Sequence, residues 1–108
     1  MRWKNKKTEA HKSDDFAELV CSNSLGADNL ANASGLMKEE LRRLGSLVIK
    51  SADNNRVPAG QALAVDRDGF SQEITSTLRK MENIEIIEEE LIEIPEDKIV
   101  LIASGPLT

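Results

Sequence analysis

The chain has 108 residues, enough for one domain or part of one. Hydrophobic residues make up 40% of it, which excludes a disordered composition, while aromatic residues make up only 3%, so the core must be aliphatic. The net charge is −5, and the sequence has neither an apolar run of membrane-spanning length nor a signal peptide. A single cysteine excludes an internal disulfide and fits a reducing compartment, so we expect a cytoplasmic location. Because no apolar run is long enough to span a membrane, we expect no membrane partner.

The first 13 residues are polar and show no period, so we expect an extended segment or loop. Their basic side chains could meet phosphate, but a solvated arm explains the charge equally well. A short helix is predicted over residues 16–20, with Asp14 and Asp15 as its N-terminal cap. The basic side chains of this segment are Arg2, Lys4, Lys6, Lys7 and Lys12.

The longest helical pattern covers residues 29–53, with Asp28 as the predicted N-cap. Its apolar residues recur at steps of three or four, which places them on one face. Gly35 and Gly45 interrupt the pattern and predict close packing or a bend. Asn54 and Asn55 are expected to end the helix. The apolar stripe consists of Leu30, Ala33, Met37, Leu41, Leu44, Val48 and Ala52.

A strand is predicted over residues 62–65, followed by a helix over residues 67–80 that Asp66 caps. The β-branched segments 84–88 and 91–94 are expected to be strands, and the wholly apolar segment 99–103 reads as a strand buried on both faces. The predicted class is therefore α/β, with two main helices and a small sheet that ends in a buried C-terminal strand. Since the chain offers that strand few neighbours, we expect the isolated chain to self-associate.

Cys21 stands between an apolar turn and the polar run Ser22, Asn23 and Ser24. A thiol in such a place is a candidate nucleophile, although a lone cysteine is more often a small buried hydrophobe. The hydroxyl and amide groups of Asn23 and Ser24 could bind a ligand, but capping of the local turn is the favoured interpretation.

Five segments together closely resemble one family, the folate- and FAD-dependent tRNA uridine-C5 methyltransferases. The agreement is colinear and spans nearly the whole chain. The segments that carry it are residues 16–25 (FAELVCSNSL), 35–47 (GLMKEELRRLGSL), 56–60 (RVPAG), 62–67 (ALAVDR) and 102–108 (IASGPLT).

The resemblance implies that residues 1–108 are an internal piece of an FAD-binding, Rossmann-like domain that lacks its glycine-rich dinucleotide loop. It implies methylation of C5 of a uridine in the T-loop of tRNA. Methylenetetrahydrofolate would supply the carbon, reduced FAD the electrons, and NAD(P)H would reduce the flavin. The isolated piece should be inactive, because the FAD phosphate loop is missing.

The resemblance also suggests roles for single residues. Cys21 corresponds to a cysteine implicated in attack on the uracil ring. Cofactor contacts are expected from one residue near each end of the chain and from five between them. Against this, His11 reads as solvent-exposed, Arg67 as part of an outer helical turn, the Leu91 side chain as core, and Gly105 as a turn glycine. The candidate cofactor-binding residues are Arg2, His11, Asn23, Ser24, Arg67, Leu91 and Gly105.

Another class of function stays open at this point. The chain could be a stand-alone RNA-binding or interaction module that uses its basic N-terminal segment.

The acidic run Glu88–Glu90 is predicted to be a solvent-exposed hairpin and not a metal site, because adjacent side chains on a strand point to opposite faces.

Overall fold

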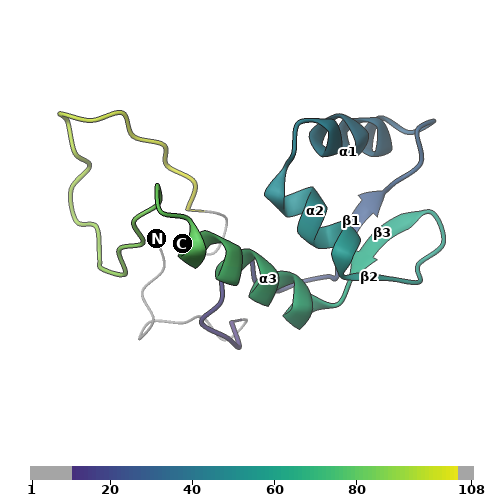
Figure 1. The fold of residues 1–108 in the computed structure, drawn as a ribbon, viewed down its shortest axis with the longest axis horizontal. Helices are drawn as coiled ribbons and strands as arrows, with labels where there is room; N and C mark the ends of the chain where they lie inside the picture. The colour runs from purple at the N-terminus through teal and green to yellow at the C-terminus, as the bar shows by residue number, and fades with distance from the viewer. Residues whose placement is uncertain (1–10, 105–108) are drawn as a thin grey trace.

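The computed structural model describes residues 11–104, so two of the predicted cofactor residues, Arg2 and Gly105, lie outside the described residues. The chain forms a mixed α/β structure, which confirms the predicted class (Figure 1). The elements in chain order are β1 (Ser24–Ala27), α1 (Ala33–Arg43), α2 (Leu47–Asn54), β2 (Arg56–Val57), β3 (Ala62–Val65) and α3 (Arg67–Lys80).

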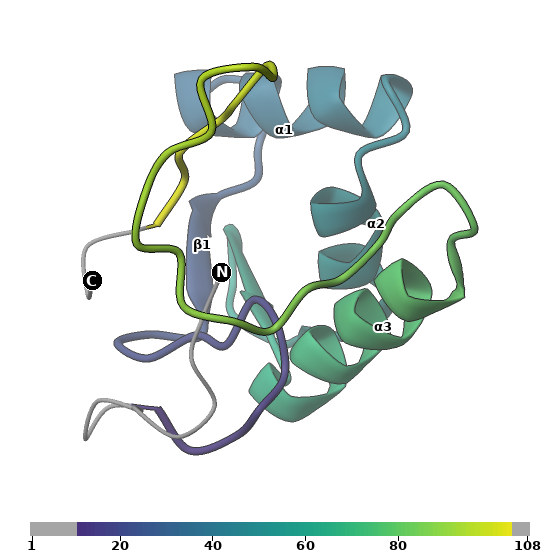
Figure 2. The same ribbon diagram turned by 90° about the vertical axis from the view of Figure 1, so that its left-hand side faces the viewer.

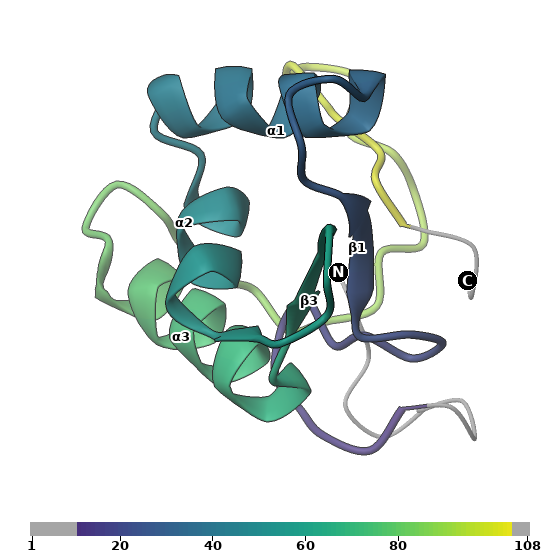
Figure 3. The ribbon, with the colours of Figure 1, turned by 90° about the vertical axis from the view of Figure 1, so that its right-hand side faces the viewer.

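The three strands form one antiparallel sheet in the order β1-β3-β2. Ser24 pairs with Ala64, and Arg56 pairs with Val65, so β3 is the central strand. Helices α2 and α3 lie on the same side of the sheet, and α1 crosses one end of it (Figures 2 and 3). The core therefore lies between β3 and the two helices α2 and α3. It consists of Ala52, Leu63, Val65, Phe70 and Ile74.

Strand β3 and helix α3 have the predicted bounds, and Asp66 caps α3 as expected. The Asp66 carboxylate accepts a hydrogen bond from the backbone N–H of Gly69 at 3.1 Å. This cap satisfies one of the backbone donors that a helix leaves unpaired at its start. The central strand therefore passes into α3 through a single capping residue.

The predicted helix over residues 29–53 is wrong in its start and in its continuity. Asn32, not Asp28, caps α1, and Gly45 separates α1 from α2 with φ of +75°. A left-handed residue commonly ends an α-helix, and glycine adopts this conformation readily because it has no Cβ. Met37 and Leu44 of the predicted stripe are exposed, while Gly35 and Lys38 form the buried face of α1.

The predicted helix over residues 16–20 is also wrong, because the segment is an irregular turn. Ala17 has φ of +56°, which a right-handed helix does not allow. The predicted caps Asp14 and Asp15 therefore have no helix to cap.

None of the three strands predicted after α3 forms. Residues 84–104 are irregular, and the segment 99–103 is exposed and not buried. A strand requires a neighbour that satisfies its backbone groups, and within residues 11–104 no such neighbour lies beside this segment. The predicted hairpin at Glu88–Glu90 is absent for the same reason, and Glu88 instead forms an ion pair with Arg79 at 3.0 Å.

Candidate functional site

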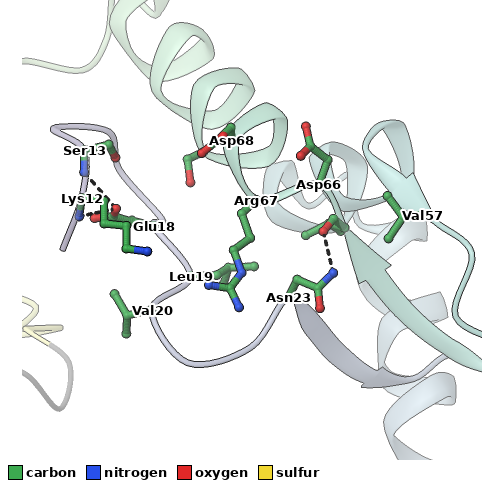
Figure 4. Close-up of a pocket in the computed structure, with 12 residues that line it drawn as sticks. Lys12, Ser13, Glu18, Leu19, Val20, Asn23, Val57, Asp66, Arg67 and Asp68 are labelled. Carbon is green, nitrogen blue, oxygen red and sulfur yellow. Dashed lines mark hydrogen bonds between the residues drawn. The ribbon is translucent and has the colours of Figure 1, made fainter. Parts of the chain in front are cut away.

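An open hollow of about 560 Å³ lies where the segment before β1 meets the start of α3 (Figure 4). Polar side chains enter it from both sides, and Leu19, Val20 and Val65 supply apolar surface. The polar and charged side chains that line it include Lys12, Glu18, Asn23, Asp66, Arg67 and Asp68.

The loop of residues 18–22 borders this hollow and carries Cys21. Val20 and Asn23 line the hollow on either side of the cysteine, whose thiol is exposed and free. A buried apolar thiol, the alternative that the sequence left open, is therefore not what the structure shows. The participation of Cys21 in chemistry stays a prediction.

Asn23 and Ser24 both make local hydrogen bonds. The Asn23 side-chain amide donates to the Val65 carbonyl oxygen at 3.1 Å, and the Val65 N–H donates to the Asn23 carbonyl oxygen at 2.9 Å. The Ser24 hydroxyl accepts a bond from the Gly26 N–H at 3.2 Å. Asn23 therefore connects the loop to the last residue of β3, and the Ser24 side chain binds the backbone two residues later within β1. Their predicted role in binding a cofactor is untested.

Arg67 is the predicted residue that most clearly faces the hollow. It is the first residue of α3, is exposed, and extends toward Leu19 and Asn23 (Figure 4). The cations Arg67 and Lys12 are balanced by nearby carboxylates, so the hollow has no net positive charge. It is suited to a ligand that presents both donors and acceptors more than to a bare anion. The lining carboxylates are Glu18, Asp66 and Asp68.

Two other predicted residues lie away from the expected environment. His11 is partly buried, and not solvent-exposed as its place in a basic segment suggested. Leu91 was expected in a strand with its side chain in the core, but it lies in irregular chain and is 54% exposed. Leu91 is not among the residues that line the hollow with Asn23 and Arg67.

Two hydroxyl residues of α3 were missed by the sequence reasoning. The backbone N–H of Phe16 donates to Thr75 Oγ1 at 2.8 Å, and Ser71 Oγ donates to the Ala17 carbonyl oxygen at 3.1 Å. Both side chains are buried, although both are polar. The only signal in the sequence for their burial was their position. Ser71 and Thr75 are four residues apart and each follows an apolar residue, Phe70 or Ile74, so both hydroxyls lie beside the inner face of the helix.

A cluster of ion pairs holds the elements that lie behind the site. Arg42 donates to Asp53 at 2.6 Å and to Asp28 at 2.8 Å, and Arg56 donates to the same two aspartates. Hydrogen bonds from Arg42, opposed by burial and aided by Arg56, lower the pKa of Asp53. Burial raises the pKa of Asp28, but the bonds from both arginines outweigh this effect and lower it overall. Glu39 forms a further ion pair with Arg43, four residues later in α1, at 3.3 Å.

The fold and the hollow together define a small α/β unit with an exposed cysteine in a loop whose residues Val20 and Asn23 line a polar hollow. Residues 5–106 match the model of the family described as Glucose inhibited division protein A, and the chain therefore belongs to that family. Among residues 11–104, no helix has the length and apolar character that crossing a membrane requires.

Curated relatives carry a more specific name. The methylenetetrahydrofolate–tRNA-(uracil-5-)-methyltransferase TrmFO of Fusobacterium nucleatum is 75% identical over 103 residues, which cover 95% of this chain and 24% of that protein. Proteins of the same name from Streptococcus sanguinis and Lactobacillus helveticus are 62% and 58% identical, again over 95% of this chain and over 23% and 25% of their own lengths. The matches confirm the family resemblance, and the chain spans about a quarter of the length of these relatives.

Proposed function

We propose that residues 1–108 act as an internal piece of the FAD-binding domain of a longer methyltransferase that forms 5-methyluridine in tRNA. One observation carries the proposal, namely the 75% identity to a protein with that printed activity over 95% of this chain. The exposure of Cys21, in a loop whose residues Val20 and Asn23 line the hollow, supports it, because a nucleophile must be reachable by its substrate. The partner is then tRNA, and a tRNA substrate favours a cytoplasmic location.

Cys21 is proposed as the nucleophile. C5 of uracil is a poor carbon nucleophile until the ring is activated. Attack of the Cys21 thiolate forms a bond from Sγ to C6, and the electron pair of the C5–C6 double bond moves toward the C4 carbonyl as an enolate, which makes C5 nucleophilic. C5 can then bond to the methylene carbon of methylenetetrahydrofolate while one of the two C–N bonds of that carbon breaks, and that folate nitrogen takes up a proton. Loss of the C5 proton with release of the thiolate restores the double bond.

The carbon unit enters at the methylene level and is still bonded to one folate nitrogen. Breaking that C–N bond to give the methyl product and free tetrahydrofolate needs two electrons and two protons, one proton for the carbon and one for the nitrogen. Reduced FAD is the proposed electron source in the longer protein, with NAD(P)H as the reductant of the flavin. The residues of this chain do not form that flavin site alone, because the sequence has no G-x-G-x-x-G run for the dinucleotide phosphates. No residue described above is therefore assigned to the electron transfer.

A chimera tests the proposal. The matched segment of the F. nucleatum methyltransferase would be replaced by this chain, and methyl transfer to tRNA lacking 5-methyluridine would be measured with labelled methylenetetrahydrofolate. We expect the chimera to be active and Cys21→Ser to lower turnover at least about a thousandfold, since removal of a nucleophile takes away the covalent route. Ser22→Ala, a change at the neighbouring exposed residue, serves as the matched control and should retain most activity. An active Cys21→Ser chimera would contradict the assignment of Cys21.

A further inference from the structure

We propose that Thr75 and Ser71 of α3, together with Asn23, are positioning residues that hold the Cys21 loop between two fixed points. The proposal rests on the proposed function, because it concerns the thiol assigned there as the nucleophile. None of the three side chains has to touch a substrate. Each acts through the backbone on one side of the loop of residues 18–22.

The first anchor lies before the loop, at Phe16 and Ala17. Thr75 and Ser71 stand one helical turn apart, and each makes one hydrogen bond to this turn, at 2.8 Å from the Phe16 N–H and at 3.1 Å to the Ala17 carbonyl oxygen. The two residues are only 7% and 3% exposed. The hydroxyl ends of both bonds are buried, while Phe16 is half-buried and Ala17 is exposed. Breaking either bond is costly chiefly because it leaves a buried hydroxyl without its partner. The left-handed conformation of Ala17, with φ of +56°, is held by these contacts.

The second anchor lies after the loop, at Asn23. Its backbone carbonyl and its side-chain amide both bind the main chain of Val65, at 2.9 Å and 3.1 Å. Val65 is 1% exposed and is the last residue of the central strand. Asn23 thus makes a two-point contact with a rigid element, which fixes both the position and the direction of the chain that leaves the loop.

Both anchors belong to the same rigid part of the molecule. Val65 ends β3, Asp66 caps α3, and Ser71 and Thr75 follow within that helix. The distance between the two ends of the loop is therefore set by one continuous strand–helix unit. A loop fixed at both ends presents its thiol in a narrow range of positions, which is what a nucleophile needs for attack on a ring carbon.

The test uses Thr75→Val in the chimera, because valine keeps the shape and the methyl contact of threonine but cannot accept the Phe16 N–H. We expect kcat for methyl transfer to fall about tenfold to a hundredfold, the range for a misplaced reacting group, with KM for tRNA unchanged. Thr75→Ser keeps the hydroxyl and should restore most of kcat. Thr77→Val is the matched control, since the Thr77 hydroxyl binds only the Glu73 carbonyl of its own helix and should leave kcat near the parent value.

Amide hydrogen exchange supplies a second readout that does not depend on activity. In the parent chimera the Phe16 and Val65 amides should be protected, and Thr75→Val should expose Phe16 while Val65 stays protected. Exchange of Phe16 at the rate of an open chain in the parent would overturn the proposal, as would equal kcat for the Thr75→Val and Thr77→Val proteins. If Thr75→Val does not fold, the parent exchange pattern decides the matter. If instead Cys21→Ser stays active, the proposed function fails, and the exchange data still decide whether the loop is anchored.

Discussion

At the scale of single residues, Arg42 of α1 connects its helix to two other parts of the fold. Its guanidinium binds Asp53 of α2 and Asp28, which follows β1, while Arg56 of β2 binds the same carboxylates. The Asp28 and Asp53 side chains are 15% and 31% exposed, so water screens these pairs only in part. The planar guanidinium group of arginine has several N–H donors and can bind two carboxylates in fixed directions, which the single ammonium group of lysine does not do. The cluster therefore fixes α1 and α2 to the edge of the sheet.

The lowered pKa values of Asp28 and Asp53 predict how stability depends on pH. In the folded state both values lie below the ordinary value of about 3.9, so in that range the unfolded chain binds more protons than the folded chain. The free energy of unfolding contributed by these groups is fully present above pH of about 4 and is lost as pH falls through the lowered values. Urea unfolding between pH 5 and pH 2.5, in steps of about half a unit, measures this loss.

A pair of variants isolates the contribution of the cluster to that loss. Asp53→Asn removes one titrating partner of Arg42, and it should flatten the dependence of unfolding free energy on pH. Asp97→Asn removes an exposed aspartate of the irregular segment and should leave the parent dependence unchanged. Identical curves for the two variants would show that the cluster does not couple proton binding to folding.

At the scale of the elements, the junction between β3 and α3 is the most sharply defined. The Asp66 side chain caps the helix, and its backbone N–H donates to the Asn55 carbonyl oxygen at 2.8 Å. One residue thus ends the central strand, begins the longest helix and contacts the end of α2. Both loop anchors are built on this junction, so its rigidity sets the rigidity of the site.

Removal of the cap should weaken α3 without changing its position. We expect Asp66→Ala to lower the free energy of unfolding by about 1 kcal/mol, because the Gly69 N–H loses its partner. Asp68→Ala, in the first turn of the same helix, is the matched control and should cost less, since it loses only a favourable charge near the helix start. Denaturant midpoints at an unchanged slope measure both effects. A larger loss for Asp68→Ala than for Asp66→Ala would show that charge, and not the cap, governs this end.

Elements whose signals are local were predictable from the sequence, and those that depend on distant partners were not. Strand β3, the Asp66 cap and α3 depend on neighbouring residues, and all three were placed correctly. The interruption at Gly45 was foreseen only as a bend. The exposed face of α1 was mistaken for its buried face, because Lys38 turns inward to donate to the Ala27 carbonyl oxygen at 2.9 Å. A pattern of apolar spacing does not reveal that a lysine will meet a strand end.

The same division applies to the candidate site. Cys21 and Asn23 stood out because their residue types are chemically active and lie only two positions apart in the sequence. Thr75 and Ser71 were missed because their partners Phe16 and Ala17 lie 59 and 54 positions away. Only the folded chain brings these pairs together.

At the scale of the whole molecule, the chain divides into a packed body and a segment that extends from α3. Residues 84–104 are irregular and lie to one side of the body, beyond the end of α3 (Figure 1). The segment is nevertheless rich in aliphatic side chains, with Ile92 at 87% exposure and Leu101 at 90%. An apolar surface of this kind marks a contact site or a liability for association.

We therefore expect the isolated chain to self-associate. Light scattering over a wide concentration range should show a mass that rises with concentration. The double variant Ile99→Lys with Leu101→Lys should reduce this rise, because it places charge in the apolar segment. Asp97→Lys changes the net charge by the same amount and is the matched control. A monomer at every concentration in the parent chain would contradict the prediction.

The long sequence separation of the loop contacts has a consequence for the order of folding. Asn23 meets Val65 across 42 positions, and Phe16 meets Thr75 across 59. Contacts of such separation form late, since a large loop of chain must close first. During synthesis Cys21 leaves the ribosome before α3, the helix whose residues anchor its loop. The thiol therefore lies in a nascent segment without these anchors until α3 has emerged.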